Sequence, residues 1–64
     1  MKRMEDVLEA AYEAHILSLY EVLTQSILSA NGNEAEIGAA QERFRHGLAF
    51  AAAVRERARA AAGL

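Results

Sequence analysis

The apolar pattern is most regular in the second half of the chain, where it predicts one long helix. Between residues 37 and 61, apolar residues or glycine recur at alternating spacings of three and four, as in the heptads of paired helices. The positions are Ile37, Ala40, Phe44, Gly47, Ala51, Val54, Ala58 and Ala61. Because most of them are alanine or glycine, a partner helix can approach more closely than a leucine seam permits.

The first half of the chain follows the 3.6-residue period of an amphipathic helix over about residues 4–30. The apolar stripe contains Met4, Leu8, Tyr12, His15, Ile16, Leu19, Val22, Leu23, Ile27 and Ala30. It does not keep one heptad register, and Leu17 and Leu28 fall on the far side of the helix. The helix therefore has two apolar surfaces, which suggest two partners: the chain's own second helix and another chain.

A short turn at residues 31–33 separates the two helical patterns. Gly32 can adopt the left-handed conformation that ends a helix, and Asn33 with Glu36 has the spacing of a capping box. Asn31-Gly32 also suits a β-hairpin, but the flanking residues do not alternate between apolar and polar. The second helix is therefore predicted over about residues 34–62.

Two helices of similar length joined by so short a turn must fold back on each other, which predicts an all-α antiparallel hairpin. Residues that face each other then have numbers that sum to about 64. The predicted interhelical ion pairs are Glu21 with Arg43, Glu9 with Arg55, and Asp6 with Arg57 or Arg59. Each exposed pair contributes only ~0–1 kcal/mol, but together they favour one register.

The size of the chain predicts a single domain, residues 1–64, that stabilises itself by association. A core of this size supplies roughly 3–5 kcal/mol, and there is no cysteine for a disulfide. We expect the hairpin to form a homodimeric four-helix bundle. The residues predicted to drive association are Leu8, Tyr12, Ile16, Leu19, Leu23, Ile27, Phe44, Leu48, Phe50 and Val54.

Phe50 lies outside the heptad seam, beside Arg43 and Arg57. On an isolated hairpin it would be exposed, as would Leu17 and Leu28. It is therefore predicted to be covered by a second subunit or to mark a site for a different protein.

Charge and composition narrow the partners. The net charge of −2 gives no general attraction to nucleic acid or to an anionic membrane. The N-terminal residues do not resemble a signal peptide, and the longest apolar run, residues 48–54, is far too short to cross a bilayer. We expect a soluble, cytoplasmic protein that does not act on membranes.

Three sets of polar residues are candidates for chemistry. Glu42 and His46 have the i, i+4 spacing of a metal pair, but a solvated helix face is the favoured interpretation. His15 lies on the apolar stripe, where we expect a hydrogen bond to the neighbouring helix; the alternative is a pH-sensitive subunit contact. Tyr12 and Tyr20 are predicted to pack in the core, with a binding hot spot as the alternative. Neither a cofactor nor a metal is expected.

Arginines concentrate near the end of the chain, at positions 55, 57 and 59. Glutamates interrupt them and no aromatic residue lies between them, so nucleic-acid binding is not their expected role.

In outline, with a central turn and alanine-rich pairing surfaces, the chain resembles two kinds of small helical hairpin. One is the plasmid-encoded RNA-binding hairpin that dimerises into a four-helix bundle; that resemblance implies RNA contacts from the first helix, which here is acidic. The other is the hairpin co-chaperone of type III secretion needle subunits, which implies a heterologous helical partner. The favoured function is a non-enzymatic protein-interaction module: an adaptor, a regulator or a co-chaperone-like protein.

Overall fold

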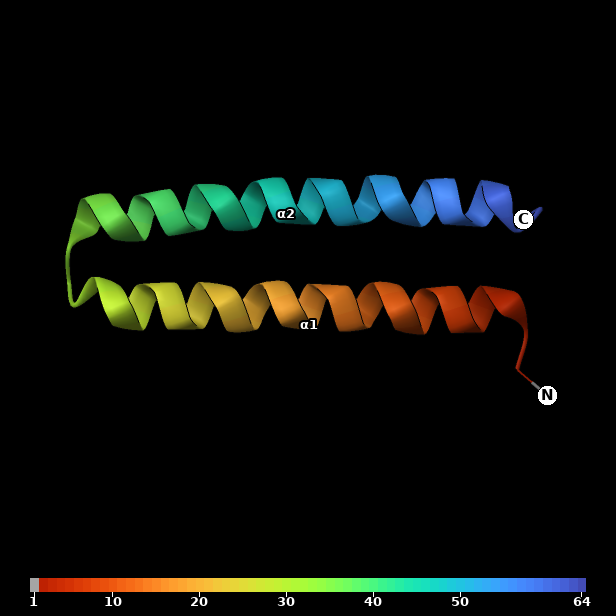
Figure 1. Ribbon diagram of the computed structural model, residues 1–64, viewed down its shortest axis with the longest axis horizontal. Coiled ribbons are helices and arrows are strands. Elements are labelled where there is room, and N and C mark those ends of the chain that lie inside the picture. Colours follow the sequence, from red (N-terminus) through yellow and green to blue (C-terminus); the bar gives the residue numbers. More distant parts are fainter. Residues whose placement is uncertain (1) are drawn as a thin grey trace.

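The computed structural model describes residues 2–64, and this part of the chain forms two long helices packed against each other (Figure 1). Helix α1 spans Met4–Ala30 and helix α2 spans Glu34–Ala61. The predicted helices and the predicted turn are therefore confirmed. Helix α2 ends one residue before its predicted end. Neither helix contains proline, so nothing interrupts the backbone hydrogen bonds along its length.

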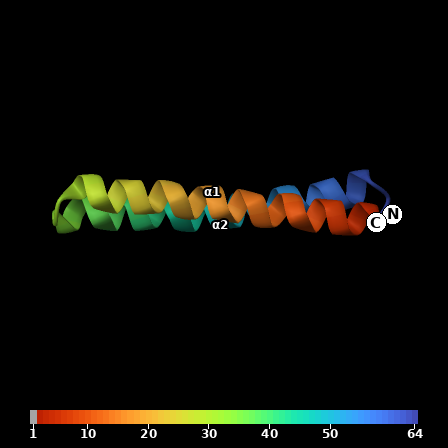
Figure 2. The same cartoon turned by 90° about the horizontal axis from the view of Figure 1, so that it is seen from below.

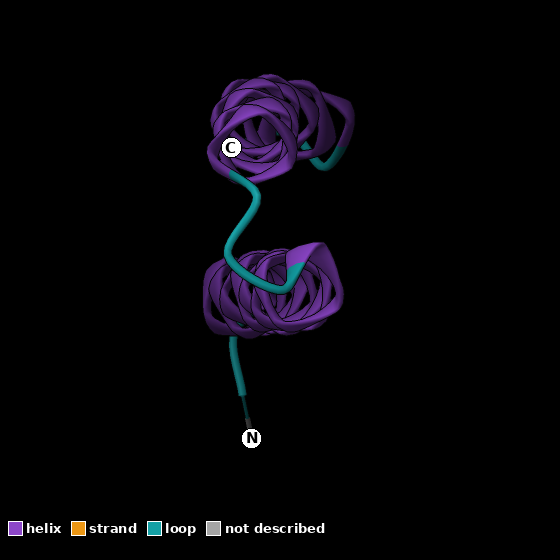
Figure 3. Cartoon of the chain, turned by 90° about the vertical axis from the view of Figure 1, so that its left-hand side faces the viewer, coloured by secondary structure: helices purple, strands orange, loops and turns teal. Residues whose placement is uncertain are grey.

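The hairpin is a thin, elongated plate. The helices run antiparallel in one layer (Figure 2), and the view along their axes shows one helix stacked on the other (Figure 3). The extents are 46 × 20 × 8 Å. A plate of one layer has two broad faces that its own chain does not cover.

The turn consists of two residues with positive φ. Asn31 has φ 50° and ψ 44°, and Gly32 has φ 85°. The backbone N–H of Asn33 donates to the Ala30 carbonyl over 3.0 Å, as in a type I′ turn. Asparagine and glycine tolerate these angles best, so the sequence fits the turn although it joins two helices rather than two strands.

Asn33 caps α2 as predicted. The Glu36 backbone N–H donates to Asn33 Oδ1 over 3.0 Å. The return bond of a capping box, from the Asn33 N–H to the Glu36 side chain, is not formed. That N–H is already donated to Ala30, so it needs no second acceptor.

The contact between the helices is built around small residues. The buried core consists of Ala30, Ala40 and Ala51, with relative exposures of 6, 3 and 1%. The larger apolar side chains between the helices are only half-buried: Leu8, Tyr12, Ile16, Leu19, Leu23, Phe44 and Leu48. In the predicted seam of α2, Val54 and Ala61 are exposed, so the seam is only partly confirmed.

Gly47 sets how closely the helices approach at their middle. A β-carbon built there would lie 2.7 Å from Leu19 Cδ2 and 3.3 Å from Leu19 Cδ1. Leu19 therefore packs directly against the backbone of α2. This is the close approach that the alanine- and glycine-rich seam predicted.

Candidate protein-interaction surfaces

Arg55 is the centre of a polar cluster between the helices. Its Nε and Nη2 lie 2.9 and 2.8 Å from Glu9 Oε2, and its Nη1 lies 3.2 Å from Glu56 Oε1. Its guanidinium carbon also lies 5.2 Å from the centre of the Tyr12 ring, in cation–π range. The hydrogen bond with Glu9 raises the pKa of Arg55. The predicted Glu9–Arg55 pair is thus confirmed, and it fixes the register of the hairpin.

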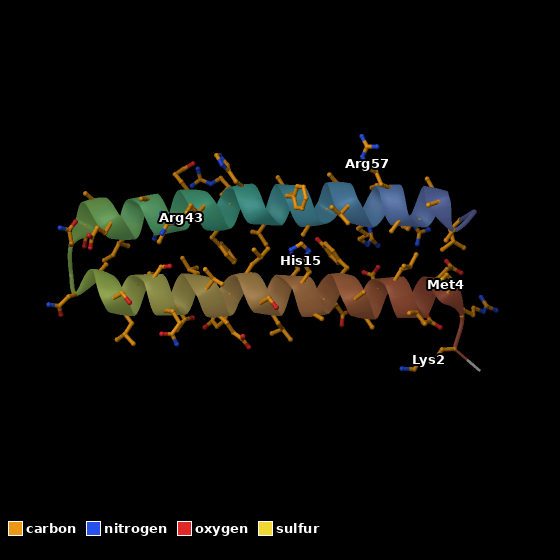
Figure 4. All side chains as sticks on the ribbon, viewed as in Figure 1. Lys2, Met4, His15, Arg43 and Arg57 are labelled. Carbon is orange, nitrogen blue, oxygen red and sulfur yellow. The ribbon has the colours of Figure 1, made fainter. Side chains whose placement is uncertain are left out.

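The other predicted interhelical ion pairs are wrong: within residues 2–64, only Glu9 and Arg55 form one. Arg43 points toward α1 (Figure 4), where it lines a hollow with Gln25 and Ser29. Glu21 lines a different hollow, with Ser18 and Val22. Arg57 points away from α1. Numbers that sum to about 64 place two residues at the same height, but pairing also requires the right angle around each helix.

His15 lies between the helices, half-buried, and points toward α2 (Figure 4). The predicted hydrogen bond to α2 is absent from the described residues. The reason is the composition of its surroundings, since the groove that it enters has mostly apolar walls. The walls are formed by Leu8, Ala11, Tyr12, His15, Ala51, Val54, Arg55 and Ala58.

Glu42 and His46 lie on the outer surface of α2. Glu42 Oε2 is 3.9 Å from His46 Nε2, and Glu42 also accepts a hydrogen bond from Arg45. Their side chains are 54 and 82% exposed. Within residues 2–64, no three side chains of histidine, cysteine, aspartate or glutamate come together in a way that would hold a metal ion.

The residues predicted to drive association divide into two groups. Seven are the half-buried side chains already described between the helices, so they stabilise the hairpin itself. Ile27, Phe50 and Val54 remain 37, 65 and 42% exposed. Tyr12 is half-buried between the helices, whereas core packing is wrong for Tyr20, which is 60% exposed.

One of the two broad faces of the plate is hollowed, and most of its charged residues belong to α2; we call it the groove face. Both helices are right-handed and antiparallel, so residues rotated in the same sense from the contact line lie on the same side of the hairpin. One hollow there is lined by Gln25 and Ser29 of α1 together with Glu36 and Ala39 of α2. The α1 strip contains Met4, Val7, Ala11, Ala14, Ser18, Val22, Gln25 and Ser29. The α2 strip contains Glu36, Ala39, Arg43, Phe50, Val54, Arg57 and Ala61, with Arg57 at its outer edge.

The α1 strip of the groove face contains no charged residue, although Glu21 lies at its edge and lines a hollow with Ser18, Val22 and Gln25. Met4, Val7 and Val22 are 54, 46 and 62% exposed on it, and Phe50 is 65% exposed on the neighbouring α2 strip. The apolar pattern of the sequence does not single out Val7 or separate this strip from the hairpin contact. The signal that could have found it was the position of the acidic residues, since all those of the first helix fall outside the strip.

Leu17 and Leu28 are 62 and 73% exposed, which confirms their predicted exposure together with that of Phe50. They project from the side of α1 opposite α2, so they do not join Phe50 in one patch.

Comparison of the chain with models of protein families, with curated proteins and with solved structures gave no match. Neither helix in residues 2–64 is long and apolar enough to cross a membrane.

Proposed function

We propose that this chain is a small non-enzymatic protein-interaction module that acts through helix–helix packing as a homodimer, with two hairpins forming a four-helix bundle. In this role it serves as an adaptor, a regulator or a co-chaperone-like protein. The observation that carries the proposal is the core: it contains three alanines, and no larger side chain in residues 2–64 is fully buried.

The exposed area supports the same proposal. The hairpin exposes 4965 Å², whereas a compact monomer of 7.0 kDa exposes about 4,000 Å². The excess of roughly 900 Å² is close to the ~800 Å² that each partner covers in a standard interface. A second copy on one broad face would therefore bring the exposed area of each chain to an ordinary value.

The radius of gyration leads to the same conclusion. It is 14.8 Å, while a compact domain of this length has about 11 Å. Single-chain folding thus leaves the molecule extended, with apolar side chains on both sides of the layer.

Multi-angle light scattering with size-exclusion chromatography at micromolar concentration tests the proposal. We expect a mass about twice 7.0 kDa. Replacement of Phe50 by lysine should shift the mass toward the monomer, because a positive charge would be buried without a counter-charge.

Leu28→Lys is the matched control, because Leu28 is also highly exposed but lies on the far side of α1. It should leave the mass unchanged. A folded, monomeric wild type would refute self-association and would favour a heterologous helical partner instead.

A further inference from the structure

We infer that the second copy docks on the groove face with its helices antiparallel to those of the first, so that the turn of each hairpin lies against the chain ends of the other. This inference rests on the homodimer proposed above and specifies its face and its direction. Three observations lead to it: the uncharged α1 strip, the charges of the α2 strip, and the register fixed by two contacts inside the hairpin.

The groove face is large enough for such a dimer. A face of 46 × 20 Å presents roughly 900 Å², which matches the area that one partner covers in a standard interface. The opposite face carries most of the acidic residues of α1, beside the Glu9–Arg55 pair. Association through the groove face leaves those charges in water.

Two symmetric arrangements bring two groove faces together. If the two-fold axis runs along the helices, α1 of each copy packs on α2 of the other. If the axis runs across the helices, α1 packs on the partner's α1 and α2 packs on the partner's α2. Each of these two helix pairs is antiparallel. The charges on the α2 strip distinguish these arrangements.

In the first arrangement, the charged residues of the α2 strip face the uncharged α1 strip. Glu36 and Arg57 would then lose water without gaining a counter-charge, which is unfavourable, and only Arg43 would come to the height of a carboxylate, that of Glu21. In the second arrangement the two α2 helices are antiparallel, so residues that face each other have numbers with a constant sum. A sum of about 93 brings opposite charges together. Glu36 then meets the partner's Arg57, and Arg43 meets the face of the partner's Phe50.

The pairing of the α2 strips is complementary in shape as well as in charge. Arg43 over the Phe50 ring is a cation–π arrangement, and the small Ala39 faces the larger Val54 of the partner. Each of these contacts occurs twice, because residue i meets residue j and residue j meets residue i.

The α1 strips are compatible with the same symmetry axis. Their members pair with one another when the numbers sum to about 36, which places Ser18 on the axis and Val7 opposite the partner's Ser29. On α2 the axis passes between His46 and Gly47. Inside the hairpin, the contacts of Glu9 with Arg55 and of Leu19 with Gly47 show that Ser18 and the axis position on α2 lie at the same height. A single axis therefore serves both helices.

A disulfide at Ser18 tests the inference, since the chain has no natural cysteine to interfere. Two helices in contact are 8–10 Å apart, so two cysteines that face each other on the axis fall within the ~4.4–6.8 Å Cα separation of a disulfide. Ser18→Cys should oxidise to a covalent dimer in high yield. Along the other axis the two positions lie diagonally across the bundle, about 13 Å apart, and cannot be joined.

A second pair of positions provides the control. Val7→Cys alone and Ser29→Cys alone should remain uncrosslinked, while the double variant should form a covalent dimer, because position 7 of each chain meets position 29 of the partner. The two positions are on the same helix, too far apart to react within one chain. Dimeric wild type with no Ser18→Cys crosslink would overturn the antiparallel arrangement and leave the proposed function intact, whereas monomeric wild type would overturn both.

Mixing two charge variants gives an independent readout. Glu36→Arg places two positive charges at each contact of its own dimer, and Arg57→Glu places two negative ones, so each variant alone should dimerise about tenfold more weakly. A mixture of the two restores both opposite-charge contacts and should form the heterodimer with about wild-type affinity. Equal affinities before and after mixing would show that these residues do not meet.

Discussion

The close contact between Leu19 and the backbone at Gly47 makes a quantitative prediction about glycine-to-alanine substitution. In a helix, alanine is favoured over glycine by about 0.8–1.0 kcal/mol. At Gly47 the added β-carbon would lie 2.7 Å from Leu19 Cδ2, and overpacking of this kind costs about 1–3 kcal/mol. The expected net change for Gly47→Ala therefore ranges from neutral to a loss of about 2 kcal/mol per chain.

Gly38 is the matched control because it lies in the same helix and a β-carbon there would meet nothing within 4 Å. Gly38→Ala should stabilise the protein by about 1 kcal/mol, or roughly 4–8 °C in the midpoint of thermal unfolding. Circular dichroism at 222 nm, with both variants at one protein concentration, measures the difference.

The contact with Leu19 can be isolated by a double-mutant cycle. In a Leu19→Ala background the obstructing methyl groups are gone, so Gly47→Ala should stabilise about as much as Gly38→Ala does. Equal stabilisation by Gly47→Ala and Gly38→Ala in the wild-type background would refute the close approach of the helices at this point.

Three further predictions concern polar contacts. Asn33→Ala removes the cap of α2 and should cost about 1 kcal/mol in chemical denaturation, while Asn33→Asp, which keeps an acceptor, should cost much less. Arg55→Lys should destabilise the protein nearly as much as Arg55→Ala, because lysine cannot make both the Nε and the Nη2 contact with Glu9. Arg45 forms an exposed ion pair within one helix, so the control variant Arg45→Lys should leave the stability unchanged. Because the pKa of Arg55 is raised, its contribution to the free energy of unfolding is complete below the ordinary arginine pKa and is lost only as the pH rises through the raised value. The free energy of unfolding should therefore show no change due to Arg55 between about pH 6 and 9.

The helices and their turn could be predicted because local signals agree there. The absence of proline, the 3.6-residue period and the Asn31-Gly32-Asn33 segment each specify the same boundaries. The cap at Asn33 depends on neighbours within three residues, so it needs no knowledge of tertiary structure. The capping-box return bond failed for the same local reason, because the turn itself uses the Asn33 N–H.

The side-chain contacts between the helices were less predictable. Antiparallel register alone placed Glu9 opposite Arg55, and both residues also lie near the contact line. Glu21 is at the height of Arg43, but the two residues line different hollows. To predict this, the rotation of each helix is needed as well as its register. His15 was assigned a hydrogen bond because polar groups between helices usually have partners, but the α2 residues around it are mostly apolar.

The division of the apolar residues into two surfaces also required the structure. A stripe that covers half of a helix includes both the residues that pack inside the hairpin and those beside them. Leu19 belongs to the first group and Val22 to the second, although they are one turn apart. Only the position of α2 shows which side chains are already covered.

Both described chain ends lie at the end of the rod opposite the turn (Figure 1). Any segment fused to either terminus therefore emerges from that one end, and the tip formed by Asn31 and Gly32 stays unobstructed. In an antiparallel pair of hairpins, two fused cargoes would be held at opposite ends, separated by a rod about 46 Å long. A hairpin of this kind is suited to act as a spacer of fixed length.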